Sequence, residues 1–102
     1  MAKAVVWTNT AMDDLEQIVR YIYRDSPSYA VSFYDTVIDK AKTLKEMSKR
    51  GRVVPELGDE HIQEISVHKY RMIYQISETR VEIITFTHGA RELNNYFEIS
   101  PR

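Results

Sequence analysis

The sequence contains no cysteine, and this absence excludes several kinds of site and scaffold. Without cysteine there is no disulfide framework, no thiolate zinc site and no cysteine nucleophile. Proline and glycine are also scarce, with three of each in 102 residues, so little of the chain is linker. No apolar run approaches the roughly 18 residues of a transmembrane helix. The N-terminal apolar stretch is too short for a signal peptide, so we expect a cytoplasmic protein without a membrane span.

The chain also lacks a surplus of positive charge, since its formal net charge is −1. Residues 1–50 carry 8 Lys and Arg against 7 Asp and Glu, and residues 51–102 carry 6 against 8. Proteins that hold nucleic acid through its phosphates are usually basic. Neither half is therefore a general polyanion-binding surface, and we expect no direct DNA binding by the chain alone. A local basic cluster would have to be made by folding.

What the sequence does contain is typical of one globular domain over residues 1–102. Apolar residues make up 43% of the chain and charged residues 28%. A chain of this length and composition can bury a modest core without a disulfide or a structural metal.

The N-terminal quarter predicts a strand followed by a helix. Residues 4–7 form a short apolar run that ends in a polar turn, which is typical of a strand. Thr10 is the expected N-cap, and the carboxylates of Asp13 and Asp14 would meet the positive end of the helix dipole. The helix should end near Arg24. Its core-facing stripe is Ala11, Leu15, Ile18, Val19 and Ile22.

A second helix should begin at Pro27, because proline fits the first turn of a helix and Ser26 can cap it. Its stripe is Ala30, Phe33, Val37, Ala41 and Leu44. Its C-terminal half is crowded by Lys40, Lys42, Lys45, Lys49 and Arg50. These cations are interpreted as a solvated face beside the helix C-terminus or as a contact for an acidic partner. The short connection predicts an antiparallel helical hairpin.

The second half predicts a loop and three strands. Residues 49–60 break the helical period with Gly and Pro, so they form a loop. Strands follow at residues 62–67, 70–76 and 80–87, with connections short enough for antiparallel hairpins. Residues 89–96 are expected to form a short helix or an edge strand. The chain therefore predicts an α+β fold, in which an N-terminal strand and a helical hairpin precede antiparallel strands of a twisted sheet.

Polar residues on the second face of this sheet indicate that part of it meets solvent or a partner. They are Arg71, Gln75, Glu82 and His88. Among these, Arg71 and His88 can lie on the same side as the turn that carries Arg91. Tyr96 follows soon after that turn.

Two guanidiniums, an imidazole and a phenol suit RNA cleavage through attack by a 2′-hydroxyl. Arg71 and Arg91 would stabilise phosphate charge, while His88 or Tyr96 would move protons. The alternative is structural: Arg71 would pair with Glu64 or Glu82 across the strands, and Arg91 with Glu92 or the C-terminal region. The three histidines lack metal-ligand spacing, so no metal or cofactor is expected.

The order of several weak motifs resembles the RelE/ParE superfamily of bacterial type II toxins, with the ParE-like branch favoured. The motifs are Trp7-Thr8, Ala11, Asp14-Leu15, Ile18, Tyr21-Ile22, Asp25-Ser26-Pro27, Ala30, Phe33, the loop Gly51-Arg52-Val53-Val54-Pro55-Glu56, Ile62, Glu64-Ile65, Val67, Tyr70-Arg71, Ile73-Tyr74, His88 and Arg91. The likeness covers about residues 5–93. It implies a growth-inhibiting toxin with this α+β fold and a cognate antitoxin that wraps it. The apolar anchors of the antitoxin would suit a groove flanking the helices and sheet. A homodimer and a heterotetramer with the antitoxin both remain open.

The two branches of the superfamily imply different targets. ParE-like toxins poison DNA gyrase by binding, and here Arg71, Arg91, Tyr96 and Phe97 would belong to the binding surface. RelE-like toxins cut messenger RNA on the ribosome. By that likeness Arg71 and Arg91 match catalytic arginines, and the catalytic tyrosine falls at Phe97, beside Tyr96.

Other nuclease members use a Glu and a His, for which Glu56 and His88 are loose candidates. The lysines that RelE carries before its arginine strand are missing, since that stretch reads Ile62-Gln63-Glu64-Ile65. A third hypothesis is a weakly toxic protein that binds the antitoxin and serves autoregulation.

Overall fold

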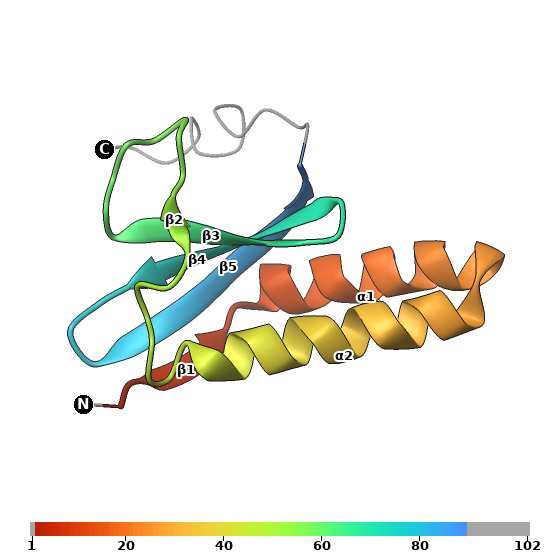
Figure 1. The fold of residues 1–102 in the computed structure, drawn as a ribbon, viewed down its shortest axis with the longest axis horizontal. Coiled ribbons are helices and arrows are strands. Elements are labelled where there is room, and N and C mark those ends of the chain that lie inside the picture. The colour runs from red at the N-terminus through yellow and green to blue at the C-terminus, as the bar shows by residue number, and fades with distance from the viewer. Residues whose placement is uncertain (1, 90–102) are drawn as a thin grey trace.

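A helical hairpin packs against a five-stranded sheet in the structure, a computed structural model that describes residues 2–89 (Figure 1). The elements are β1 (Ala4–Trp7), α1 (Asn9–Asp25), α2 (Pro27–Thr43), β2 (Arg52–Val53), β3 (Ile62–Val67), β4 (Tyr70–Ile76) and β5 (Arg80–His88). The predicted α+β order of strand, helical hairpin and strands is confirmed. The two-residue β2 was not predicted. Apart from Gly89, the expected element at residues 89–96 lies outside the described residues.

The sheet is mixed, with the strand order β1-β5-β4-β3-β2. The pairs β2–β3, β3–β4 and β4–β5 are antiparallel, as predicted. The N-terminal β1 instead pairs in parallel with β5. The first and last strands of the described chain therefore lie side by side, with the helical hairpin between them in sequence.

The first helix is capped by Thr8, so the prediction of Thr10 as N-cap is wrong. The Thr8 hydroxyl accepts from the Ala11 N–H at 3.0 Å and donates to the Ile84 carbonyl at 2.8 Å. The second bond is a tertiary contact with β5. It fixes the N-cap of α1 at the residue directly after β1, whereas the sequence pattern alone favoured a later start of the helix.

Asp14 does not serve the helix dipole as predicted, because no acidic residue lies in the first turn of α1. Its carboxylate instead accepts from the Phe86 N–H at 3.1 Å and from the Thr85 hydroxyl. The register of β1 with β5 ends at Trp7 opposite Ile83. Asp14 thus accepts a hydrogen bond from the backbone of β5 beyond the point where its pairing with β1 stops.

The second helix begins where the sequence predicts. Ser26 is its N-cap and accepts from the Tyr29 N–H at 3.2 Å, and Pro27 occupies the first turn. The predicted stripe of α2 is buried throughout: Ala30, Phe33, Val37, Ala41 and Leu44. These side chains join the apolar face of β3, β4 and β5 in one core.

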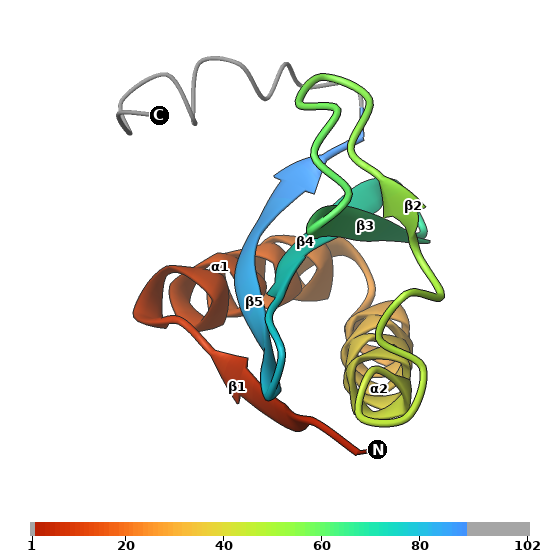
Figure 2. The same ribbon diagram turned by 90° about the vertical axis from the view of Figure 1, so that its left-hand side faces the viewer.

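The two faces of the sheet are covered by different parts of the chain. The helices cover one face, and the segment between β2 and β3 lies over the other (Figures 1 and 2). Under that segment, Val54 and Ile73 are fully buried and Leu57 and Ile62 pack against them. Within residues 2–89, no helix is both long and apolar enough to cross a membrane.

Candidate functional site

Arg71 is the second residue of β4 and points away from the helices. Its register partners are Ser66 on β3 and Thr87 on β5. The side chain is only 7% exposed, because the segment between β2 and β3 folds over this face of the sheet. The prediction that part of this face meets solvent is confirmed at Gln75, which is exposed on the same strand, but Arg71 itself is buried.

Two carboxylates hold the Arg71 guanidinium. Its Nε donates to Glu64 Oε1 at 2.6 Å, while Nη1 and Nη2 donate to the two oxygens of Glu56 at 2.9 and 2.8 Å. Its Nη2 also lies 2.5 Å from Glu64 Oε1. The predicted pairing with Glu64 is confirmed. The alternative pairing with Glu82 is wrong, since Glu82 lies opposite Gln75, farther along β4.

Glu64 also links Arg71 to the edge of the sheet. Its second oxygen accepts from Arg52 Nε at 2.6 Å, so two arginines and two glutamates form one network of zero net charge. Glu64 is 1% exposed at its side chain, whereas Arg52 is 69% exposed. We call these four residues, Arg52, Glu56, Glu64 and Arg71, the Arg–Glu network.

The network favours the charged form of its central arginine. The hydrogen bonds that Arg71 donates to Glu56, and to a lesser extent those to Glu64, raise the pKa of Arg71 against the opposing effect of burial. A buried guanidinium in this state is a structural cation whose charge is already compensated. Its chemistry is to fix the position of the overlying segment, because Glu56 is carried by that segment.

A tight turn in the segment aims Glu56 at the sheet. The N–H groups of Leu57 and Gly58 donate to the Val54 carbonyl at 3.1 and 3.0 Å. Gly58 has φ 64°, a conformation that favours glycine. Sequence reasoning named Glu56 only as a loose nuclease candidate. The apolar Val54 and Leu57 around it are the signal that this segment packs on the sheet.

His88 does not join Arg71. It lies opposite Tyr70 on β4, one residue away from Arg71, so its side chain projects from the helix-covered face. The His88 and Tyr70 rings meet edge to face at 5.6 Å between centroids. The side chains of Arg71 and His88 lie on opposite faces of the sheet, so the expectation that they share a side is wrong. Arg91, Tyr96 and Phe97 lie outside the described residues.

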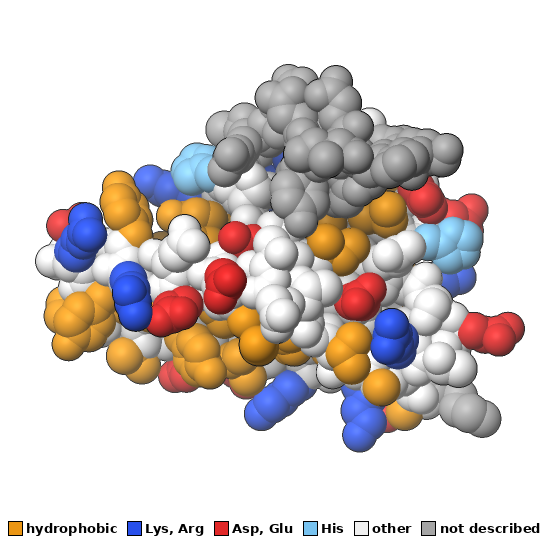
Figure 3. Space-filling view, turned by 180° about the vertical axis from the view of Figure 1, so that it is seen from behind, with side chains coloured by type: hydrophobic (Ala, Val, Ile, Leu, Met, Phe, Trp, Pro, Cys, Tyr) orange, Lys and Arg blue, Asp and Glu red, His pale blue; other side chains and the backbone are white. Residues whose placement is uncertain are grey.

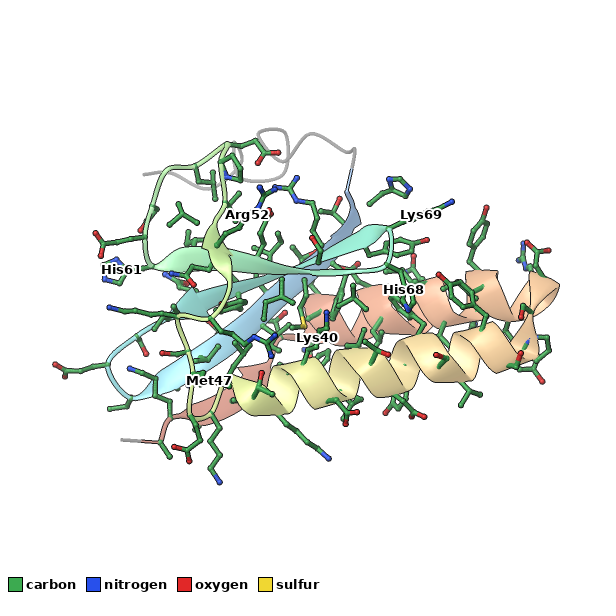
Figure 4. All side chains as sticks on the ribbon, viewed as in Figure 1. Lys40, Met47, Arg52, His61, His68 and Lys69 are labelled. Atoms are coloured by element: carbon green, nitrogen blue, oxygen red, sulfur yellow. The ribbon has the colours of Figure 1, made fainter. Side chains whose placement is uncertain are left out.

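The histidines are spread over the molecule. His61 lies at one end of β3 and His68 at the turn beyond its other end (Figure 4). His68 packs against Tyr29 and Phe33, which places it in the row of rings that also contains Tyr70 and His88. Between residues 2 and 89, no group of three or more His, Asp or Glu side chains could hold a metal ion.

An apolar groove of about 460 Å³ lies between β1 and the two helices. Its apolar lining consists of Trp7, Met12, Leu15, Val19, Tyr34 and Ile38. We call this the helix groove. The exposed ion pair of Glu16 and Arg20, 2.7 Å long, also borders it. Hydrophobic side chains gather along the helices when the molecule is seen from behind (Figure 3).

Two of the residues that line the helix groove, Trp7 and Leu15, are held in place by packing against the core. Trp7 stacks on Phe86 with the ring centroids 5.7 Å apart, and Leu15 is buried. Met12 and Tyr34 remain 51% and 46% exposed. Large exposed apolar side chains around a preformed concavity are typical of an interaction site rather than of a solvent-facing surface.

Comparisons with known proteins identify a family and two similar folds. Residues 5–93 match the family model described as the ParE toxin of the type II toxin-antitoxin system, parDE. The fold is similar to a chain of the chromosomal ParDE system from P. aeruginosa, with TM-score 0.71 and 14% identity over 85% of this chain and 96% of that one. It is also similar to a chain of the RelBE2 toxin-antitoxin complex from Mycobacterium tuberculosis, with TM-score 0.56 and 22% identity over 89% and 95%. No curated protein matches the sequence.

Proposed function

We propose, for a chain that belongs to the ParE toxin family of type II toxin-antitoxin systems, that it inhibits growth by binding DNA gyrase and not by cleaving RNA. The chain is a toxin of the ParE/RelE kind. The proposal concerns the target and the mode of action. The single observation that carries it is the state of Arg71.

Cleavage of RNA by the RelE-like mechanism would require Arg71 to contact a phosphate. In this fold the guanidinium is 7% exposed and already hydrogen-bonded to two carboxylates. A phosphate at this place would meet Glu56 and Glu64 as well, and like charges at such short range repel. An arginine in a neutral, buried network suits a structural role. A toxin that works through an exposed surface requires no catalytic arginine at this position.

The partner that neutralises the toxin is proposed to be a cognate antitoxin that inserts apolar side chains into the helix groove. An amphipathic segment presents such anchors at intervals of three and four residues, and a groove between helices receives them. Met12 and Tyr34 are the exposed anchoring positions on the toxin side. The solved ParDE and RelBE2 chains come from toxin-antitoxin systems, which supports this kind of partner.

The target is tested by pulse labelling in cells that express the chain without antitoxin. We expect thymidine incorporation to fall within the first minutes while methionine incorporation continues. An early fall of methionine incorporation would instead support a ribosome-dependent nuclease. Continued growth with both labels incorporated would support the weakly toxic, autoregulatory alternative.

Two controls make the labelling result specific. Co-expression of the neighbouring antitoxin gene should restore thymidine incorporation. A gyrase supercoiling assay with the purified chain should show inhibition that the antitoxin reverses. If thymidine incorporation falls in cells but gyrase is unaffected in the purified assay, the toxin acts on DNA synthesis through a different protein.

A further inference from the structure

The positive charge of the chain is concentrated in one short segment. Residues 40–52 contain six of the 14 Lys and Arg but only one of the 15 Asp and Glu, Glu46, which gives +5. The remaining 89 residues contain eight basic and 14 acidic side chains, which gives −6. The near-neutral total therefore hides a strongly asymmetric charge distribution.

Folding increases this charge asymmetry by placing Lys3 next to the segment. The Lys3 N–H donates to the Lys45 carbonyl at 2.9 Å, which ties the N-terminus to the end of α2. Figure 2 shows the start of the chain next to that end of α2. Lys3, Lys42 and Lys45 together line a recess of about 480 Å³.

A second recess of about 330 Å³ lies between the end of α2 and the edge of β3. Lys40, Arg50 and Arg52 line it together with Glu64, the partner of Arg52, and Figure 4 shows Lys40 between α2 and the sheet and Arg52 near β2. We call the six cations of the two recesses the basic end: Lys3, Lys40, Lys42, Lys45, Arg50 and Arg52.

Neither the helix dipole nor internal ion pairing accounts for the basic end. α2 ends at Thr43, and the dipole acts within the last turn, so it explains Lys40 and Lys42 only. Arg52 is the single member that forms a salt bridge within residues 2–89, with Glu64. Lys40 and Lys3 donate to backbone carbonyls, which leaves their charge uncompensated.

We propose that the basic end binds the phosphate backbone of duplex DNA, weakly and without sequence preference. Four of its six cations are lysines, which act on phosphates as point charges and so suit loose contact with a repeating backbone, whereas recognition of one fixed carboxylate or phosphate group favours the bidentate fork of arginine. A single strand would also require aromatic platforms for its bases. Among residues 2–89 the large exposed aromatic side chains, Tyr21, Tyr23, Tyr29 and Tyr34, all belong to the helices, and residues 40–52 contain no aromatic residue.

This inference goes beyond the proposed target, because it concerns DNA itself and does not depend on gyrase. The net charge of −1 led to the expectation that the chain alone binds no DNA, and the proposal departs from that expectation for this one end of the molecule, where folding gathers the cations. The acidic remainder of the molecule would orient the toxin so that only the basic end approaches the duplex. Such a contact would raise the local concentration of the toxin near any target that works on DNA.

The test measures fluorescence anisotropy of a labelled duplex of mixed sequence with the purified chain at several salt concentrations. We expect a dissociation constant on the order of 10⁻⁵ M at low salt that weakens as salt rises, as counterion release requires. The Lys42→Glu and Lys45→Glu double variant should bind at least about tenfold more weakly and lower the salt slope by about two.

The matched control is the double variant Arg24→Glu and Lys69→Glu. It changes the net charge by the same amount at exposed positions outside the basic end, and it should keep the affinity of the parent chain. The proposal is overturned if both double variants lose affinity equally, or if the parent chain binds no duplex at low salt. It is also overturned if labelled polyglutamate binds to the chain and the duplex does not compete.

Discussion

Both faces of the sheet carry buried side chains of β4, but different interactions cover them. On one face, β4 contributes Met72, Tyr74 and Ile76 to an apolar core under the helices. On the other face, the same strand contributes Arg71 to the Arg–Glu network. The apolar face depends on the area removed from water, whereas the charged face depends on compensation between a few named groups.

This difference shows why an alternating strand does not reveal which of its faces is exposed. The alternation along β4 is correct, and Arg71 does point away from the helices. Its burial comes from a segment more than ten residues earlier in the chain, which closes over it through Glu56. The two surfaces that we propose for binding, the helix groove and the basic end, lie elsewhere on the molecule.

Removal of the central cation should have the largest effect, because it attacks the charged face alone. Arg71→Met removes the buried cation that Glu56 and Glu64 share and leaves the exposed Arg52 as the remaining cation of the network, so it should lower the free energy of unfolding by about 3–5 kcal/mol. Urea denaturation measures this loss. The matched control is Arg52→Met at the exposed end of the network, which should cost less than about 1 kcal/mol. Equal stability of Arg71→Met and the parent chain would remove the distinction between the two faces.

A methyl group at Gly51 should disturb the close contact of Gly51 with Glu64 on β3 and Tyr74 on β4. Its Cβ would lie 2.5 Å from both the Glu64 carbonyl oxygen and the Tyr74 hydroxyl, and the first of these is backbone that cannot rotate away. Gly51→Ala should therefore cost about 1–3 kcal/mol in thermal or urea unfolding. Gly58→Asn is the comparison, since that site is open and asparagine tolerates its left-handed conformation. A Gly51→Ala chain as stable as the parent would show that this edge is not closely packed.

A charge in the helix groove should separate binding from folding. Met12→Glu places a carboxylate on a 51% exposed side chain, so the core is spared while an apolar anchor of the antitoxin loses its site. The affinity for the antitoxin, measured by calorimetry, should fall by about tenfold or more. Val31→Glu is the matched control, because Val31 is 58% exposed on the same hairpin outside the groove. Equal losses in the two variants would place the antitoxin elsewhere.

The smallest effect is expected at Tyr74, the polar group of the apolar face. Its hydroxyl donates to Gln63 Oε1 and accepts from the Gly51 N–H, so Tyr74→Phe should cost about 1 kcal/mol. Burial raises the pKa of Tyr74, which means that the folded state favours the neutral phenol. This stabilisation is present below the unfolded value near pH 10 and is lost as the pH rises through the folded value. Alkaline unfolding of Tyr74→Phe should therefore begin at higher pH than its neutral-pH stability alone predicts. Parallel pH profiles would contradict the account.

Local signals sufficed for the elements whose ends depend on neighbouring residues. Ser26 and Pro27 defined the start of α2, because capping and proline geometry act within one turn. Thr8 was missed as the cap of α1, since part of its role is a bond to Ile84 on a distant strand. The parallel pairing of β1 with β5 is likewise a long-range choice that leaves no mark in either segment.

Arg71 is the one member of the predicted site that belongs to the Arg–Glu network, since His88 lies on the other face and Arg91, Tyr96 and Phe97 lie outside the described residues. The pairing of Arg71 with Glu64 followed from the proximity of adjacent strands. The two hydrogen bonds that Arg71 donates to Glu56 could not be predicted in this way, because they require the turn at Gly58 and the packing of Val54 under the loop. The sequence already brings Lys40, Lys42, Lys45 and Arg50 of the basic end together, but it does not indicate Lys3. Lys3 joins it only through the backbone bond to Lys45.

The measurement that tests the central claim most directly is growth inhibition by a chain in which the Arg–Glu network has lost its buried charges. The triple variant Arg71→Met, Glu56→Gln and Glu64→Gln removes cation and carboxylates together, which avoids an uncompensated buried charge. Circular dichroism and antitoxin binding confirm the fold. We predict that the folded variant still stops thymidine incorporation as the parent chain does. A folded, antitoxin-binding variant that no longer inhibits growth would contradict the account and assign Arg71 to the toxic activity itself.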